Sequence, residues 1–183
     1  MKTNKLSKTL TAELNEQMTK EAQASQTFLS YASWAEDQGF DGIANVLSGH
    51  AEEAHKHMMK MLEYILKRGE EVRLTSILSP PENPENVNNC FEKVFEHEIE
   101  NTRLFHKLVK MSFDEEDWAT WNFMQWFVKE QIEEETLAMD LLDKLKIAGG
   151  EKDSSDALYS SDRDRGKTAD GAISAQDVTA DNP

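Results

Sequence analysis

The sequence predicts an all-α fold, a bundle of four long helices, and three observations support this prediction. Four segments of helix-forming composition carry apolar residues at the helical period, at about residues 5–37, 41–68, 87–113 and 115–148. No proline falls inside any of these segments. The chain has no run of alternating polar and apolar residues typical of a strand, and no repeat of fixed period.

The connections between the segments predict how the helices pair. Only a few residues separate the first segment from the second and the third from the fourth, so each pair should form an antiparallel hairpin. About 18 residues join the second segment to the third, and they contain Pro80, Pro81 and Pro84. A connection of this length can run back along a bundle, which predicts two hairpins joined by a long crossover.

Composition restricts the classes of function. The 183 residues include 20 Lys and Arg against 35 Asp and Glu, and the resulting net charge of −15 would repel a nucleic-acid backbone and attract cations. The single cysteine, Cys90, excludes an intramolecular disulfide and predicts a packing residue or a surface thiol. No stretch is long and apolar enough for a membrane span or a signal peptide. These features predict a soluble cytoplasmic protein without a nucleic-acid or membrane partner.

The composition of the chain changes from Gly149 on, and this change predicts two parts. Residues 1–148 hold the helical segments and should form one domain. Residues 149–183 contain no Phe, Trp or Met, so they bury too little apolar surface to offset the entropy of ordering. We expect a flexible acidic C-terminal extension, with room for one short helix or turn near residues 155–165.

Polar residues interrupt the apolar stripe of every helical segment. The five that fall at inward-facing positions are Glu21, His57, Glu98, Gln131 and Glu134. Three more carboxylates lie one helical step to the side: Glu53, Glu130 and Glu133. A buried carboxylate costs several kcal/mol unless it is protonated, paired or bound to a metal, and no lysine or arginine shares these stripe positions. Oxygen ligands with one imidazole suit iron or manganese, so the pattern favours a metal site inside the bundle.

Less specific interpretations stay open for single residues. A lone glutamate on a helix is more often exposed, and a run such as Glu133 to Glu135 is usually a solvated face. His50, His97 and His106 are interpreted as structural or surface histidines rather than ligands. The metal interpretation depends on the coincidence of acids on all four segments.

Four blocks of sequence resemble the non-haem bacterial ferritins, over roughly residues 6–148. They are Leu14-Asn15-Glu16-Gln17-Met18 leading to Glu21, residues 50–53 leading to His57, the pair His97-Glu98, and residues 123–135. The resemblance implies a ferritin-like four-helix bundle with a short fifth helix. It also implies a hollow shell of 24 identical subunits that oxidises Fe(II) with dioxygen or peroxide and stores ferric mineral.

The resemblance also implies roles for particular residues. Glu21 and His57 resemble terminal ligands of one iron in a dinuclear ferroxidase centre, and Glu98 a ligand of the second. Gln131 occupies the place of a nearby glutamine. Four acids resemble a third, outer iron site: Glu53, Glu130, Glu133 and Glu134.

Two departures from the family pattern affect the expected activity. Ala54 stands where the family has a bridging glutamate, three residues before His57, and Phe28 replaces a tyrosine. The pair Glu52 and His55 has the spacing of the missing motif, but it is displaced by about 200° around the helix. Without a shared anion, two iron ions pair less favourably, so we expect a slower ferroxidase.

Four functional hypotheses follow. The first is an iron-storage ferritin subunit with impaired ferroxidase activity. The second is a non-catalytic iron-binding shell subunit that relies on mineral-surface oxidation or on active partner subunits. A DNA-protecting mini-ferritin is disfavoured by the negative charge, and a purely structural bundle leaves the unpaired acids unexplained. For assembly, exposed apolar residues such as Trp34, Phe40 and Leu74 are expected to face neighbouring subunits.

Overall fold

A computed structural model describes residues 5–149 of the chain, with side chains to residue 145. Within this part the chain forms four α-helices and no strand, which confirms the predicted all-α bundle. The helices are α1 (Lys8–Asp37), α2 (Asp41–Lys67), α3 (Val87–Asp114) and α4 (Trp118–Gly149). The expected fifth helix near 155–165 and the C-terminal extension lie outside the described residues.

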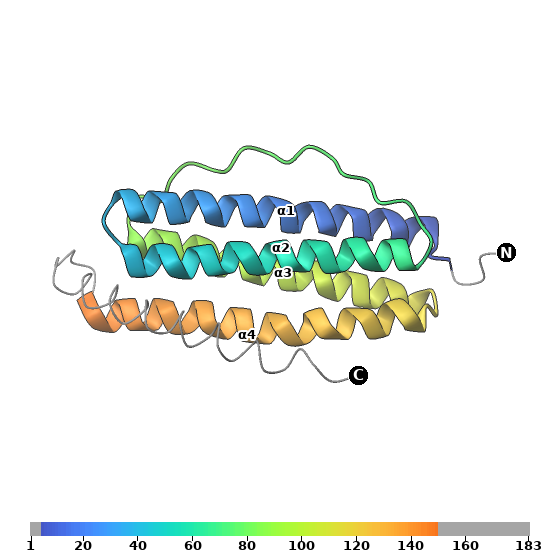
Figure 1. Cartoon of the computed structure of the whole chain (residues 1–183). Helices are drawn as coiled ribbons and strands as arrows, with labels where there is room; N and C mark the ends of the chain where they lie inside the picture. Colours follow the sequence, from blue (N-terminus) through green and yellow to red (C-terminus); the bar gives the residue numbers. More distant parts are fainter. Residues whose placement is uncertain (1–4, 150–183) are drawn as a thin grey trace, which may run out of the picture.

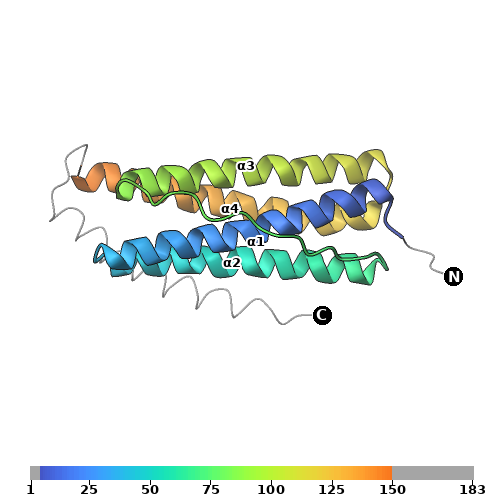
Figure 2. The same ribbon diagram turned by 90° about the horizontal axis from the view of Figure 1, so that it is seen from above.

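The helices pair as two hairpins that lie side by side (Figure 1). The closest backbone approaches are α1 with α2 and α3 with α4. Residues 68–86 run back along the bundle, so α2 and α3 point the same way, as do α1 and α4 (Figures 1 and 2). None of the four helices combines the length and apolar content that a membrane crossing demands, within the residues described.

Short polar side chains set several helix ends. Ser7 accepts a hydrogen bond from the Leu10 backbone N–H at 3.0 Å and so begins α1, three residues later than the sequence predicts. Asn86 caps α3 in the same way, through the Asn89 N–H at 2.9 Å. Gly39, with φ 81°, makes the turn between α1 and α2 in the left-handed region open to glycine.

The α3–α4 turn differs from the sequence prediction, which begins the last helix at residue 115. Glu115 instead ends α3, and Glu116 follows with a φ of 56°. A left-handed conformation costs a non-glycine residue roughly 1–2 kcal/mol. Asp117 offsets part of that cost, because its carboxylate accepts the Thr120 N–H at 3.0 Å and caps α4.

Asn15 fastens the crossover to α1. Its side-chain amide donates to the Glu71 carbonyl oxygen at 3.1 Å and accepts the Arg73 N–H at 2.6 Å. Asn15 is itself buried, so these bonds satisfy its polar atoms. Val72 of the crossover packs against the core, whereas Leu74 and Leu78 point outward and are 75% and 79% exposed.

Two other residues expected at the surface are only partly exposed. Trp34 and Phe40 are half-buried and pack against the core at the α1–α2 turn, so only part of each side chain is available to a neighbouring subunit. An apolar residue beside a turn still has a core face available, which the sequence pattern did not reveal. Cys90 is fully buried, which decides between the two interpretations in favour of packing.

The hydrophobic core is divided in two along the bundle axis. One cluster surrounds Phe28, Leu47, Phe91 and Leu141, and the other surrounds Leu14, Met61, Phe105 and Phe127. Between them lies a layer of buried polar and charged side chains. This polar layer is where the predicted metal ligands meet.

Candidate metal centre

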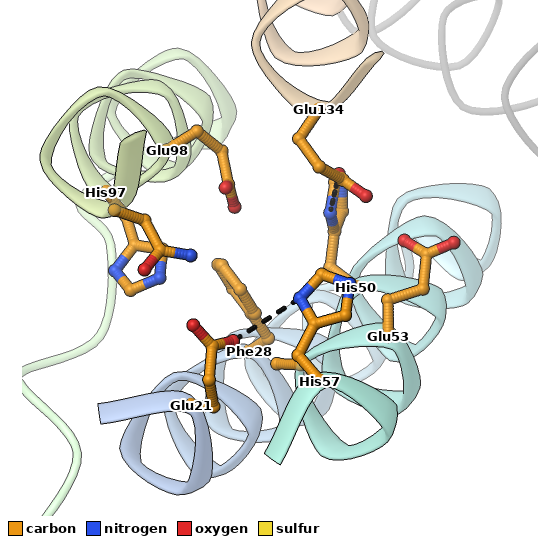
Figure 3. A pocket seen from close by; sticks show the side chains of 10 residues that line it. Glu21, Phe28, His50, Glu53, His57, His97, Glu98 and Glu134 are labelled. Carbon is orange, nitrogen blue, oxygen red and sulfur yellow. Dashed lines mark ion pairs between the residues drawn. The ribbon is translucent and has the colours of Figure 1, made fainter. Parts of the chain in front are cut away.

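Each helix contributes to the polar layer. Its buried charged and amide side chains are Gln17 and Glu21 from α1, His50 and His57 from α2, Glu98 and Asn101 from α3, and Gln131 and Glu134 from α4. In each helix these positions continue an apolar stripe, so the packing that buries the stripe also buries the polar group. The layer therefore follows from the sequence pattern, and Figure 3 shows how its side chains turn toward one another.

A cavity of about 10 Å³ lies at the centre of this layer, which is room for roughly one water molecule or ion. Glu21, Glu53, Glu98 and Glu134 line it with carboxylates, and three histidines contribute imidazoles: His50, His57 and His97. No lysine or arginine lines the cavity among the residues whose side chains are described. The negative charge of this site therefore has only imidazoles to balance it.

Glu21 and His57 face each other across the α1–α2 interface, with 3.4 Å between Glu21 Oε2 and His57 Nδ1 (Figure 3). Gln17 supports this pair, because its amide donates to Glu21 Oε1 at 2.9 Å and to Asn101 Oδ1 at 2.7 Å. Burial lowers the pKa of His57, but the hydrogen bond and charge of Glu21 outweigh it and the net shift is upward. Trp126 packs edge-on against the imidazole, with ring centroids 5.4 Å apart.

Glu98 enters from α3 and meets α4. Gln131 Nε2 donates to Glu98 Oε2 and to the Glu98 carbonyl oxygen, both at 3.2 Å. Burial, with repulsion from Glu134, raises the pKa of Glu98 to about 7. Gln131 Oε1 is buried without a hydrogen-bond partner. Because burial disfavours the charged form of Glu98, a bound cation would stabilise that form.

His50 and Glu134 form the third contact of the layer, with 3.3 Å between His50 Nδ1 and Glu134 Oε2. Burial opposes a charge on His50, yet hydrogen bonding and charge from Glu134, reinforced by Glu98 and Glu53, raise its pKa to about 9. The same interaction outweighs burial and lowers the pKa of the Glu134 carboxyl. His50 Nε2 and Glu134 Oε2 are nevertheless buried without a properly oriented hydrogen-bond partner.

The structure brings most of the predicted site residues together, although not all of them. Five of the predicted residues line the cavity: Glu21, Glu53, His57, Glu98 and Glu134. Gln131 does not line it, but its side-chain amide donates a hydrogen bond to Glu98.

The two remaining acids of the predicted outer site do not line the cavity. Glu130 is half-buried, and burial together with the nearby Glu133 raises its pKa. Glu133 is exposed and forms an ion pair with Lys129 at 3.7 Å. Any outer site that used both would therefore open toward solvent.

The two departures from the family pattern lie at the cavity itself. Ala54 is buried and lines it with a methyl group, where a glutamate would offer two oxygens. Phe28 is also buried, and its ring lies 5.5 Å from that of His50 and 5.1 Å from that of His97. Glu52 and His55 are exposed on the outer side of α2.

Sequence reasoning missed three contributors to the site. His50 and His97 were interpreted as structural or surface residues, but both line the cavity. Asn101, which also lines it, was not considered. For His50 the signal was available, because it lies on the same inward stripe of α2 as Ala54 and His57. A stripe that carries two histidines opposite acids on three other helices could have indicated that both belong to one site.

The donor set determines what the centre can bind. Carboxylate oxygens and imidazole nitrogens together suit divalent first-row transition ions, and a compact cavity lined by buried carboxylates favours charge neutralisation by such an ion. Both hairpins, α1–α2 and α3–α4, contribute ligand atoms, so a bound cation would also link the two hairpins.

Comparison with known proteins identifies relatives over most of the chain. The family model for the ferritin-like domain matches residues 11–148. A probable bacterial non-heme ferritin-like protein of Haemophilus influenzae is 35% identical, over 88% of this chain and 96% of its own length. A bacterial non-heme ferritin of Campylobacter jejuni is 37% identical, over 79% of this chain and 86% of its own length.

Solved structures agree with these relatives. An open-pore ferritin of the archaeon Archaeoglobus fulgidus superimposes with a TM-score of 0.84 at 35% identity. The match covers 88% of this chain and 98% of that one. A match at this identity and coverage extends beyond the general likeness of helical bundles.

Proposed function

The chain belongs to the ferritin family, and from that premise we propose that it is an iron-storage subunit with a slowed ferroxidase centre. In this proposal it binds Fe(II), oxidises it to Fe(III) and deposits ferric mineral inside a shell of 24 copies in the cytoplasm. The shell is the form that the family resemblance implies, and the net charge of −15 would attract Fe(II) to it.

One observation supports the proposal most strongly: Glu21, His57 and Glu98 come from three different helices and line a single buried cavity. They are the residues that the family resemblance assigns to iron. Structural packing alone gives no reason to bury two carboxylates opposite an imidazole without a lysine or arginine.

The proposed roles follow from position. Glu21 and His57 hold one Fe(II), with Gln17 orienting Glu21, while Glu98, oriented by Gln131, holds the second. Each Fe(II) gives one electron to dioxygen or peroxide, so the protein supplies ligands and charge neutralisation rather than electrons. Ala54 offers no anion between the two ions, and Phe28 offers no hydroxyl near them. Both changes would slow paired oxidation.

The test compares Fe(II) oxidation by this chain and by Ala54→Glu, followed by absorbance of the ferric product under air. We expect the variant to have an initial rate at least roughly 10-fold higher, because a bridging carboxylate stabilises two adjacent cations. The matched control is Ala12→Glu, at a site on α1 outside the cavity, which should leave the rate unchanged. If Ala54→Glu is no faster than this chain, the role assigned to Ala54 is wrong.

A second candidate function is favoured by the same two departures. A subunit without the bridge at position 54 and the hydroxyl at position 28 could bind iron without oxidising it, and rely on the mineral surface or on active partner subunits. Anaerobic Fe(II) titration followed by rapid mixing with air separates the two functions. Stoichiometric binding without a fast oxidation phase would select the non-catalytic subunit.

A further inference from the structure

Asn101 of α3 places a side-chain amide at the wall of the central cavity, where it is 6% exposed and has no role in the function proposed above. We propose that this amide binds the oxidant, by donating a hydrogen bond to dioxygen or peroxide beside the iron ions. The inference rests on the proposed ferroxidase function and adds a catalytic residue to it.

Hydrogen bonding fixes which end of the Asn101 amide faces the cavity. The Glu21 carboxylate can only accept, so Gln17 turns its NH2 group toward Glu21 Oε1, at 2.9 Å. The same nitrogen donates to Asn101 Oδ1 at 2.7 Å, so the oxygen of Asn101 faces Gln17. Among the described residues this is the only hydrogen bond of the Asn101 side chain. The amide nitrogen, with two N–H donors, is therefore left for the cavity that Asn101 lines.

Few other groups of the cavity suit this role. The imidazoles of His50 and His57 each face a carboxylate, and Phe28 has no hydroxyl. Asn101 is the only amide that lines the cavity among the residues whose side chains are described. An amide does not titrate, so it remains a donor whatever the pH. Neutral donors that are already oriented stabilise negative charge where it develops during a reaction.

The electron balance of the oxidation shows where such a donor acts. Two Fe(II) ions give one electron each to dioxygen, which takes up two protons from water and leaves as hydrogen peroxide. Peroxide takes the same two electrons and two protons and leaves as two water molecules. Negative charge thus collects on oxygen atoms in a space into which Glu21 and Glu98 also point (Figure 3). The N–H dipole of Asn101 offsets the repulsion from these acids without giving up a proton.

The test replaces the amide with an apolar side chain of similar size, Asn101→Leu. At saturating Fe(II) under air we expect the initial oxidation rate to fall at least roughly 10-fold, as it does when an oxyanion donor is removed. Anaerobic Fe(II) affinity should stay within about two-fold of the unaltered chain, because the lost interaction is with the oxidant and not with iron. Asn122→Leu replaces an exposed asparagine of α4 and is the matched control, which should change neither quantity.

A second measurement does not depend on oxidation. Nitric oxide is a diatomic ligand of Fe(II), and its binding to the anaerobic, iron-loaded protein is followed by electron paramagnetic resonance. In Asn101→Leu this binding should weaken by roughly 5-fold, the value of one neutral hydrogen bond. If the unaltered chain has no fast oxidation phase, the proposed ferroxidase is wrong, and the affinity for nitric oxide still decides whether Asn101 contacts a diatomic ligand.

Two results would overturn the proposal. One is an unchanged affinity for nitric oxide in Asn101→Leu. The other is a loss of Fe(II) affinity as large as the loss of oxidation rate, which would mean that Asn101 acts through Gln17 and Glu21 and not on the oxidant. If Asn101→Leu fails to fold, Asn101→Ala replaces it with the same expected results, because alanine also removes the donor and adds no bulk.

Discussion

Two buried polar clusters lie along α2, and they differ in how completely their charges are paired. Near the end of α2, Arg68 forms a two-pronged ion pair with Asp117, at 3.0 and 2.7 Å, and also donates to Thr120 at 2.9 Å. At the middle of the helix, His50 and His57 face four carboxylates, and His50 Nε2 is buried without a hydrogen-bond partner.

The comparison separates a structural cluster from a binding cluster. The Arg68 cluster carries its own permanent cation and satisfies it with a carboxylate and two hydroxyls, so it needs nothing further. Among the side chains that the structure describes, the central layer has more acids than imidazoles and no guanidinium or ammonium group. A buried cluster is complete when every charge in it is paired within the protein, and such a cluster stabilises the fold. An incomplete cluster, with unpaired charges, is stabilised by the ion that it binds.

The largest expected effect comes from breaking the complete cluster. Asp117→Asn leaves the Arg68 charge buried without its carboxylate and should lower the free energy of unfolding by about 3 kcal/mol. Guanidinium denaturation measures this loss, and anaerobic Fe(II) binding to the folded variant should be unchanged. Asp114→Asn removes an exposed acid of the same turn and should cost less than about 0.5 kcal/mol. Equal effects of the two variants would contradict the distinction between the clusters.

The pH dependence of that effect sharpens the comparison. Burial opposes the charge of Asp117, but hydrogen bonding to Arg68 outweighs it and holds the pKa of the carboxyl below its ordinary value of 3.8. A depressed pKa stabilises the fold above the ordinary value and loses this contribution as the pH falls through the lower, folded value. The stability difference between the unaltered chain and Asp117→Asn should therefore be constant near neutral pH and shrink below about pH 4. A difference that does not shrink as the pH falls below about 4 would contradict this assignment.

A smaller effect of opposite sign is expected in the incomplete cluster. Because burial raises the pKa of Glu98 to about 7, its charged form is unfavourable in the metal-free fold. Glu98→Gln should therefore stabilise the metal-free protein at pH 8 by about 1–2 kcal/mol. Thermal unfolding with and without Fe(II) under anaerobic conditions tests this, since the advantage should reverse when the metal is present. Glu96→Gln, an exposed acid on the same helix, should change neither measurement.

The smallest effect concerns the partial support that the central layer does have. Gln17→Met removes the amide that donates to Glu21 and Asn101 and should destabilise the fold by about 1 kcal/mol. Anaerobic Fe(II) affinity should fall with it, because Glu21 loses its orienting bond. Gln26→Met, an exposed glutamine on the same helix, is the control for helix propensity. Unchanged iron affinity in Gln17→Met would show that Glu21 is positioned by its helix alone.

Much of this arrangement could be predicted from the sequence, for a physical reason. Helix existence and inward faces depend on periodicity over many residues, so the sequence predicts that Glu21, His57, Glu98 and Gln131 lie inside the bundle. The sequence predicts the start of the last helix about three residues too early, because Glu115, Glu116 and Asp117 contain neither glycine nor proline, and the capping bond that begins α4 depends on one side-chain rotamer. The contact between His50 and Glu134 was missed because pairing across helices depends on their relative rotation.

The bond that Asn15 makes to the crossover has a consequence for how this fold can vary. Both of its contacts there are to main-chain atoms, the Glu71 carbonyl and the Arg73 N–H, so the amide recognises the path of the peptide and not the identity of its side chains. Residues along that segment are consequently free to change in evolution as long as the main chain passes the same point. The exposed surface of the crossover can thus vary without disturbing the helices beneath it.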